Sequence, residues 1–222
     1  MQQLLHRRCQ GEPLAYIIGE REFWSLPLSL GSGALIPRPD TELLVDLALQ
    51  RLSELPAGDI IELGTGSGAI ALALAQEVPG RPIIAIERHD AALQIARNNV
   101  SQFGQDRVHL VQGSWLDCIA PQSAAMIISN PPYLASDDPH LPSLQYEPQT
   151  ALVSGTTGLE DFEQIIEASC RAGKPGCLLL LEHGQDQAAS VRAILEHHGF
   201  GRIKTHQDLS GHERVSLGYL YQ

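Results

Sequence analysis

Short apolar runs alternate with amphipathic stretches along the chain from residue 58 onward. Apolar runs without polar alternation are typical of strands buried on both faces, as in a parallel sheet. They predict strands at 59–63, 82–87, 108–111, 124–129 and 177–181. Helical periodicity between them predicts helices at 68–77, 90–103, 157–172 and 185–198. This alternation indicates an α/β fold with a doubly wound, mostly parallel sheet.

The two ends of the chain depart from this pattern. Strand candidates near 200–206 and 213–221 are separated only by a loop, which predicts an antiparallel hairpin at one edge of the sheet. Near the N-terminus, residues 21–28 alternate polar and apolar positions and contain a proline, which favours an edge strand or small hairpin. Asp40 is a candidate cap for the helix that follows, with Glu42 favourable in its first turn. The side chains expected to face inward from that helix are Leu43, Leu44, Leu47 and Ala48.

The composition is that of a globular protein, with 43% hydrophobic and 18% charged residues in a chain of 222. The 26 acidic residues outnumber the 15 Lys and Arg residues, and the formal net charge of −11 disfavours general binding to a phosphate backbone. No apolar stretch approaches the ~20 residues of a membrane span, and the N-terminus has no apolar run of a secretory signal. We therefore expect a cytoplasmic protein that binds neither membranes nor, directly, nucleic acids.

The cysteines and histidines indicate neither a disulfide framework nor a metal site. No pair of the four cysteines has the CxxC spacing, and the nine histidines form no HExxH motif. Reduced, mostly buried thiols are the expectation for Cys9, Cys118, Cys170 and Cys177.

A glycine-rich loop follows the first predicted strand and leads into a helix. Its glycines allow a sharp turn and the close approach of a ligand, where a Cβ would collide. Glu87 ends the next strand, 23 positions after Gly64, where a carboxylate can accept hydrogen bonds from both hydroxyls of a ribose. This combination predicts nucleoside-cofactor binding by Glu87 and by a loop made of Gly64, Thr65, Gly66, Ser67 and Gly68.

Two cofactors fit these residues: a dinucleotide and S-adenosylmethionine. The terminal antiparallel hairpin favours S-adenosylmethionine, and so does a motif that follows the fourth strand. Trp115, just past the third strand, is placed to cover an adenine ring, although an ordinary core tryptophan is the alternative.

The motif is Asn130-Pro131-Pro132-Tyr133, at the carboxyl edge of the sheet where ligands bind in such folds. The prolines remove two backbone donors and leave carbonyls that only accept hydrogen bonds, and Asn130 adds a side-chain acceptor. Acceptors that hold both hydrogens of a planar –NH2 group favour a pyramidal nitrogen and stabilise the positive charge that grows during methyl transfer. Tyr133 offers a flat face for stacking. These residue types therefore predict a methyltransferase that acts on planar nitrogens.

At this point the chain resembles the PrmC/HemK family, the methyltransferases that modify the glutamine of the Gly-Gly-Gln motif in peptide chain release factors. The residues that carry the resemblance are 21–24, 36–42, 62–68, 130–133 and 182–184. The family implies a class I S-adenosylmethionine-dependent methyltransferase with a Rossmann-like sheet, and a release factor as the protein partner. It also implies a catalytic domain at 41–222, preceded at 1–40 by a remnant of an N-terminal region with a linker and small hairpin.

The resemblance also implies the roles of individual residues. Asn130, Pro131 and Tyr133 would be catalytic, and these three together with Pro132 would hold the substrate glutamine. The cofactor would be bound by the glycine loop (Gly64 to Gly68), Glu87, Trp115 and Asn130.

Three alternatives stay open. A ribosomal-protein glutamine methyltransferase would use the same chemistry, although residues 37–42 favour the release-factor branch. An adenine-N6 nucleic-acid methyltransferase would also use it, but should bring a basic recognition region. A non-catalytic cofactor-binding module would need no acceptor loop, so Asn130 and Tyr133 argue against it.

Overall fold

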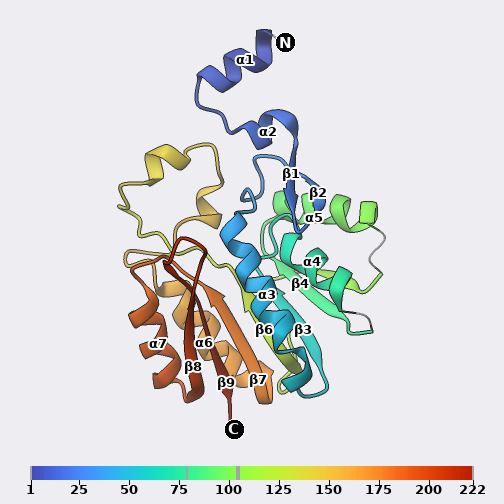
Figure 1. Ribbon diagram of the computed structural model, residues 1–222, viewed down its shortest axis with the longest axis vertical. Coiled ribbons are helices and arrows are strands. Elements are labelled where there is room, and N and C mark those ends of the chain that lie inside the picture. The colour runs from blue at the N-terminus through green and yellow to red at the C-terminus, as the bar shows by residue number, and fades with distance from the viewer. Residues whose placement is uncertain (1, 79, 104–105, 222) are drawn as a thin grey trace.

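A seven-stranded sheet covered by helices on both faces forms the centre of the molecule (Figure 1). The structure is a computed structural model and describes residues 2–78, 80–103 and 106–221. The strands of the sheet are β3 (Asp59–Leu63), β4 (Ile83–Glu87), β5 (Val108–Gln112), β6 (Ala124–Ser129), β7 (Gly173–Glu182), β8 (Phe200–Gln207) and β9 (Glu213–Leu220). The helices around it are α3 (Glu42–Gln50), α4 (Ala69–Glu77), α5 (Asp90–Phe103), α6 (Glu160–Ala172) and α7 (Ala188–His197).

The strand order confirms the predicted fold class. The order is β5-β4-β3-β6-β7-β9-β8, and the five strands β3 to β7 run parallel to their neighbours within that group. The antiparallel hairpin of β8 and β9 lies at one edge as expected, with β9 inserted between β7 and β8. Strand β7 begins at Gly173, four residues earlier than the apolar run predicts, and its pairing with β6 is irregular over that stretch.

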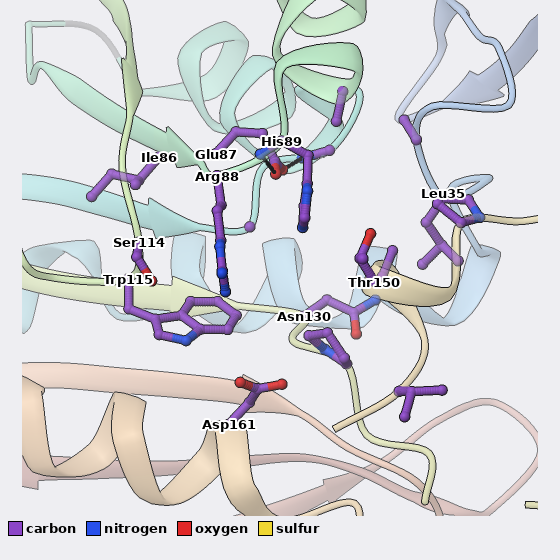
Figure 2. A pocket seen from close by; sticks show the side chains of 18 of the residues that line it. Leu35, Ile86, Glu87, Arg88, His89, Ser114, Trp115, Asn130, Thr150 and Asp161 are labelled. Carbon is purple, nitrogen blue, oxygen red and sulfur yellow. Dashed lines mark hydrogen bonds between the residues drawn. The ribbon is translucent and has the colours of Figure 1, made fainter. Parts of the chain in front are cut away.

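The order of the strands determines where a ligand can bind. The chain adds β4 and β5 on one side of β3 and then returns to place β6 on the other side. Connections that leave neighbouring strands in opposite directions open a crevice at their carboxyl ends, and this switch point is the usual ligand site of such sheets. Here it lies between the ends of β3 and β6, and Figure 2 looks into it.

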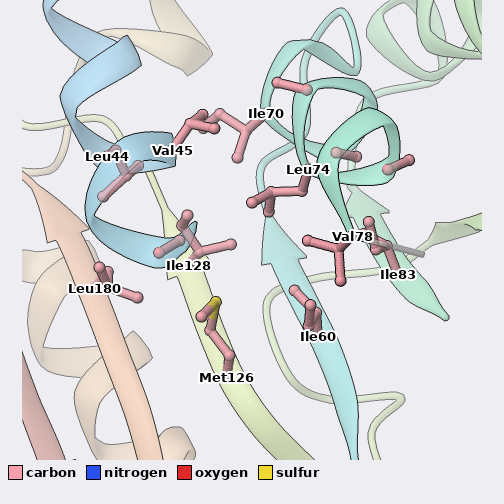
Figure 3. Packing of buried hydrophobic residues seen from close by; sticks show 14 of the residues in the cluster. Leu44, Val45, Ile60, Ile70, Leu74, Val78, Ile83, Met126, Ile128 and Leu180 are labelled. Atoms are coloured by element: carbon pink, nitrogen blue, oxygen red, sulfur yellow. The ribbon is translucent and has the colours of Figure 1, made fainter. Parts of the chain in front are cut away.

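Two hydrophobic clusters hold the layers together, one on each face of the sheet. On the first face, α3 and α4 pack on β3, β6 and β7, as the side chains of Leu44, Leu74, Ile60 and Ile128 show in Figure 3. On the second face, α6 and α7 cover the same strands through residues such as Phe162. Because these strands are buried on both faces, they are almost continuously apolar, which is the property that made them predictable.

The hairpin near the N-terminus packs against this frame. Helices α1 (Gln2–Cys9) and α2 (Leu14–Ile18) lead into the hairpin of β1 (Glu20–Phe23) and β2 (Leu26–Ser29), which confirms the predicted hairpin. Phe23 and Leu28 are buried in the first-face cluster. Asn99 on α5 fixes the hairpin, since its side chain accepts a hydrogen bond from Ser29 N at 2.8 Å and donates one to Ser29 O at 3.0 Å.

Two expectations were wrong. Asp40 does not cap the first long helix: residues Pro39–Thr41 form a 3-10 turn, and Thr41 occupies the N-cap of α3 without a side-chain capping bond. The proline at the first position of the turn explains the shift, because its fixed φ starts the helical backbone early. The thiols are not mostly buried either, since Cys9, Cys118 and Cys170 are exposed and only Cys177 is buried. Within the described residues, no helix is long and apolar enough to cross a membrane.

Candidate active site

The glycine loop between β3 and α4 adopts backbone conformations that favour glycine. Gly64, Gly66 and Gly68 have φ angles of 67°, 57° and 85°, a region that residues with a Cβ enter only at a cost. The loop is tied to the neighbouring strand, because Thr65 N donates a hydrogen bond to Ile86 O at 3.0 Å. Its exposed glycine, Gly64, presents bare backbone to the crevice.

Glu87 lies beside this loop at the end of β4. Its Oε2 accepts a hydrogen bond from Gly66 N at 3.0 Å and its Oε1 accepts one from His89 N at 2.8 Å. The residue is only 6% exposed, yet it lines the crevice. A carboxylate offers about four acceptor positions, so two remain for a ligand. Glu87 therefore both anchors the glycine loop and presents acceptors to the cavity.

Glu62 supports the loop from behind. It is 1% exposed and accepts a hydrogen bond from Thr65 Oγ1 at 2.6 Å. Burial raises the pKa of its carboxyl group to about 8, against the opposing effect of the Thr65 hydrogen bond. The protonated acid is consequently the favoured form at neutral pH, which avoids an unpaired charge beneath the loop.

A cavity of about 470 Å³ opens in front of the loop, within the range of small-molecule pockets. Six of the residues predicted for the site line it: Gly64, Gly66, Glu87, Trp115, Asn130 and Pro132. Thr65, Ser67, Gly68 and Pro131 are not among the lining residues and are buried behind them. Ser67 and Gly68 shape the turn instead, since Ser67 O accepts a hydrogen bond from Asn99 and Gly68 is the N-cap of α4.

The Trp115 ring forms one wall of the cavity (Figure 2). A Cβ on Gly64 would lie 3.6 Å from Cζ3 of this ring, so the indole packs directly over the glycine loop. Asp161, near the start of α6, lines the same cavity and lies close enough to Trp115 for the indole to lower the pKa of its carboxyl group. Burial raises the pKa of the Asp161 carboxyl group, with hydrogen bonds from Ser154 and Trp115 opposing the shift. Trp115 is thus a cavity wall and not an ordinary core side chain.

Several lining residues were missed by sequence reasoning. Arg88 and His89 follow Glu87 directly, and Figure 2 shows Arg88 extending toward the Trp115 ring. Because these two residues directly follow a strand that ends at the site, the sequence could have indicated that they line the cavity. Leu35 and Thr150 reach the cavity from segments distant in the sequence, and Asp161 enters from a third. No local pattern indicates these three, because their place depends on tertiary packing.

A second cavity, of about 380 Å³, adjoins the first. Tyr133 lines it, together with the buried Glu147 and the partner of its ion pair, Arg38. Glu147 also accepts a hydrogen bond from Ile36 N at 3.1 Å, so it joins the segment before α3 to the loop that follows β6. Asn130 lines both cavities and therefore stands where they meet.

The two polar atoms of the Asn130 side chain differ in their hydrogen bonding. Its Nδ2 donates to Thr41 Oγ1 at 3.3 Å, whereas its buried Oδ1 has no hydrogen-bond partner in the described part of the chain. A buried acceptor left unpaired is costly and is a common sign of a ligand site. Gln187 holds the loop beyond it, since its Nε2 donates to Tyr133 O at 2.8 Å. Burial raises the pKa of the Tyr133 phenol to about 12, so this ring stays neutral.

The fold is similar to those of solved methyltransferase structures. The catalytic domain of hMettl16, in complex with MAT2A 3′UTR hairpin 1, matches with a TM-score of 0.71 at 19% identity, covering 94% of this chain and 79% of that one. A methyltransferase from Pyrococcus furiosus matches with a TM-score of 0.65 at 17% identity, covering 100% of both chains. At these identities the likeness concerns the fold alone.

Sequence relatives give the family. Residues 40–144 match the family model described as "Methyltransferase small domain". The release factor glutamine methyltransferase of Escherichia coli (strain K12) is 48% identical over 221 residues, which cover 99% of this chain and 79% of the relative. The protein of the same name from Vibrio cholerae is 47% identical, covering 98% of this chain and 77% of the relative. This chain therefore belongs to the family of release factor glutamine methyltransferases.

Proposed function

We propose that this protein transfers a methyl group from S-adenosylmethionine to the side-chain amide nitrogen of the glutamine in the Gly-Gly-Gln motif of peptide chain release factors. The observation that carries the proposal is the position of Asn130, which lines both cavities and whose buried Oδ1 has no hydrogen-bond partner in the described part of the chain. One cavity has the residues of a nucleoside site, and the other is lined by Tyr133. A methyl donor in the first and a glutamine side chain in the second would meet at Asn130.

The residues of the first cavity fit S-adenosylmethionine. Glu87 has free acceptor positions for ribose hydroxyls, and the Trp115 ring offers a flat wall for adenine. Gly64 and Gly66 leave space where a side chain would block a ligand. The cofactor, when bound, supplies an electrophilic methyl group on a sulfonium centre. Asp161 and Arg88 contribute further polar groups to the wall of this cavity.

The substrate amide is activated by acceptors. We assign Asn130 Oδ1 to one hydrogen of the glutamine –NH2 group. The second is assigned to the carbonyl oxygen of Pro131: the residue itself is buried, but its carbonyl carbon is bonded to the nitrogen of Pro132, which lines the first cavity. Holding both hydrogens turns the nitrogen lone pair toward the methyl donor and stabilises the positive charge that develops on nitrogen. Transfer would form the N–C bond and break the S–C bond of the donor, and the methylated amide would then release one proton to water. Tyr133, kept neutral by its raised pKa, stacks on the planar amide, and Pro132 stiffens the loop.

The proposal is tested by substrate choice. The protein is incubated with methyl-labelled S-adenosylmethionine and, in separate reactions, with a release factor, ribosomal protein and DNA. We expect label only on the release factor, on the glutamine of its Gly-Gly-Gln motif. A release factor in which that glutamine is replaced by alanine is the matched control and should stay unlabelled. Label on ribosomal protein or DNA in place of the release factor would contradict the proposal.

A further inference from the structure

A buried carboxyl group lies next to Asn130. Strands β6 and β7 are parallel neighbours in which Ser129 pairs with Leu181. Asn130 follows Ser129 and Glu182 follows Leu181, so the two residues occupy equivalent positions at adjacent strand ends. Thr41, at the N-cap of α3, completes the group: its hydroxyl accepts a hydrogen bond from Asn130 Nδ2 at 3.3 Å, and it lies close enough to the Glu182 carboxyl to lower its pKa. The Asn130 side chain likewise lies close enough to the Glu182 carboxyl to lower its pKa.

The Glu182 carboxyl group is deeply buried and incompletely paired. It is 2% exposed, and its Oε2 has no hydrogen-bond partner among the residues that the structure describes. It lines neither cavity, so it does not touch a ligand directly. Burying an acid without full pairing is costly, and side chains of this kind are retained mainly where they serve a site.

A carboxylate at this position discriminates between the two orientations of the Asn130 amide. With Nδ2 on the side of Thr41 and Glu182, the amide donates to Thr41 Oγ1, and Oδ1 is left for the substrate. With the amide turned over, Oδ1 would face a carboxylate that has no hydrogen to donate, and the two acceptors would repel. Asparagine side chains otherwise take either orientation readily, since their oxygen and nitrogen are nearly equal in size.

We propose that Glu182 is a positioning residue that acts through Asn130: the carboxylate keeps Oδ1 directed to the substrate amide. The inference rests on the proposed function, since it assigns Asn130 Oδ1 to the substrate. Thr41 assists by accepting from the same Nδ2. Glu182 lines neither cavity, so its effect should vanish when Asn130 is absent.

The charge of Glu182 should give the reaction a pH dependence. Burial raises the pKa of its carboxyl group to about 7, with hydrogen bonds from Thr41 and Asn130 and the charge of Arg214 opposing the shift and the charge of Asp40 adding to it. Tyr133 also faces this group but stays neutral over the range, and burial keeps the neighbouring His183 neutral by lowering its pKa. Ionised Glu182 orients Asn130, so kcat should rise as the pH passes about 7.

The first test compares wild type with Glu182→Gln, which keeps the shape and removes the charge. A glutamine can donate to Asn130 Oδ1 and therefore accepts both amide orientations. At a pH where Glu182 is ionised in wild type, we expect the kcat of Glu182→Gln to be roughly tenfold lower. The rise of kcat with pH should disappear in this variant, and the Kd for S-adenosylmethionine should stay unchanged. An unchanged pH profile and kcat in Glu182→Gln would overturn the proposal.

The second test places Glu182→Gln in an Asn130→Ala background. If Glu182 acts through Asn130, the single variant Asn130→Ala and the double variant Asn130→Ala/Glu182→Gln have the same residual single-turnover rate. An equal fold-loss in both backgrounds would show that the charge acts on the reaction independently of Asn130 and would overturn the proposal. Thermal unfolding and cofactor binding of each variant confirm that the proteins compared are folded.

A third readout needs no substrate and separates this inference from the proposed function. The side-chain amide NMR signals of Asn130 are identified by their loss in Asn130→Ala. In wild type their chemical shifts should change as the pH passes about 7. They should lose that titration in Glu182→Gln. Signals that do not titrate in wild type would overturn the positioning role. A titration accompanied by no methylation of any release factor would leave the positioning intact and contradict the proposed function instead.

Discussion

The carboxylate of Glu87 accepts a hydrogen bond from the backbone N–H of Gly66 at 3.0 Å and so joins the end of β4 to the glycine loop after β3. The same side chain lines the larger cavity. One residue therefore sets the shape of the loop and offers acceptors to a ligand. This double use makes cofactor affinity depend on Glu87 more strongly than a single contact would.

Glu87→Ala is expected to weaken S-adenosylmethionine binding by at least tenfold. Hydrogen bonds to a charged acceptor contribute roughly 1.5–3 kcal/mol each, and the variant also releases Gly66 N and His89 N. Isothermal titration calorimetry measures the Kd. Glu167→Ala removes an exposed acid of α6 and is the matched control. A Glu87→Ala protein with the wild-type Kd would show that Glu87 is not the ribose ligand.

Gly158→Ala is expected to lower kcat by tenfold or more through displacement of Tyr133. A Cβ at Gly158 would lie 2.4 Å from Tyr133 O, and the residue also has a φ of 77°. Displacements of about 1 Å at a reaction site cost up to ~10²-fold in rate.

The control for this variant is Gly199→Ala. Gly199 has a φ of 80°, but a Cβ there would meet nothing within 4 Å. It should lose roughly 1 kcal/mol of stability from backbone strain alone and keep its kcat. Steady-state kinetics and denaturant unfolding of both variants make the comparison. Equal kcat values in the two variants would mean that the Gly158 contact does not position Tyr133.

Glu62→Gln is expected to make the free energy of unfolding less dependent on pH. Glu62 titrates near 4.5 when unfolded and at about 8 when folded. Between these values the folded chain keeps a proton that the unfolded chain has released, so wild-type stability falls as the pH rises. The variant lacks this contribution and should gain stability relative to wild type from about pH 5 to about pH 8. Urea unfolding across this range measures the free energy of unfolding of both proteins. If the two plots of this free energy against pH were parallel, the prediction would be contradicted.

Glu147→Ala is expected to raise the KM for the release factor roughly tenfold while leaving the Kd for S-adenosylmethionine unchanged. Glu147 fixes two walls of the second cavity through Arg38 and Ile36 N. Without Glu147 the walls of the second cavity should become less well ordered, whereas the walls of the first cavity should not change. Glu196→Ala, an exposed acid on α7, is the control. If cofactor affinity fell instead, the assignment of the second cavity to the substrate would be wrong.

The parallel sheet could be predicted because its strands are apolar on both faces. The predicted β6 and α5 agree with the structure at both ends, since β6 is an uninterrupted apolar run and Asp90 marks the helix start. Strand β7 was harder: Lys174 and Pro175 precede its apolar run and give no strand signal, although the strand begins at Gly173.

The site residues that the sequence predicts are those that lie at or just after the end of a strand. Glu87 and Asn130 stand at the strand ends that meet at the crevice, so their proximity followed from the topology. Glu182 also ends a strand, but its relation to Asn130 depends on the register of β6 with β7. Thr41 and Glu147 enter from helix and loop segments whose packing no local pattern encodes.

The central claim is that Asn130 presents an acceptor to the substrate amide where two cavities meet. Its most direct test is the rate at which the release-factor glutamine gains a methyl group, followed by tandem mass spectrometry, with wild type and with Asn130→Ala at saturating S-adenosylmethionine. We expect a methyl group on the side-chain nitrogen of the Gly-Gly-Gln glutamine and a loss of about 10²–10³ in rate for the variant. Methylation of that glutamine by Asn130→Ala at the wild-type rate would contradict it.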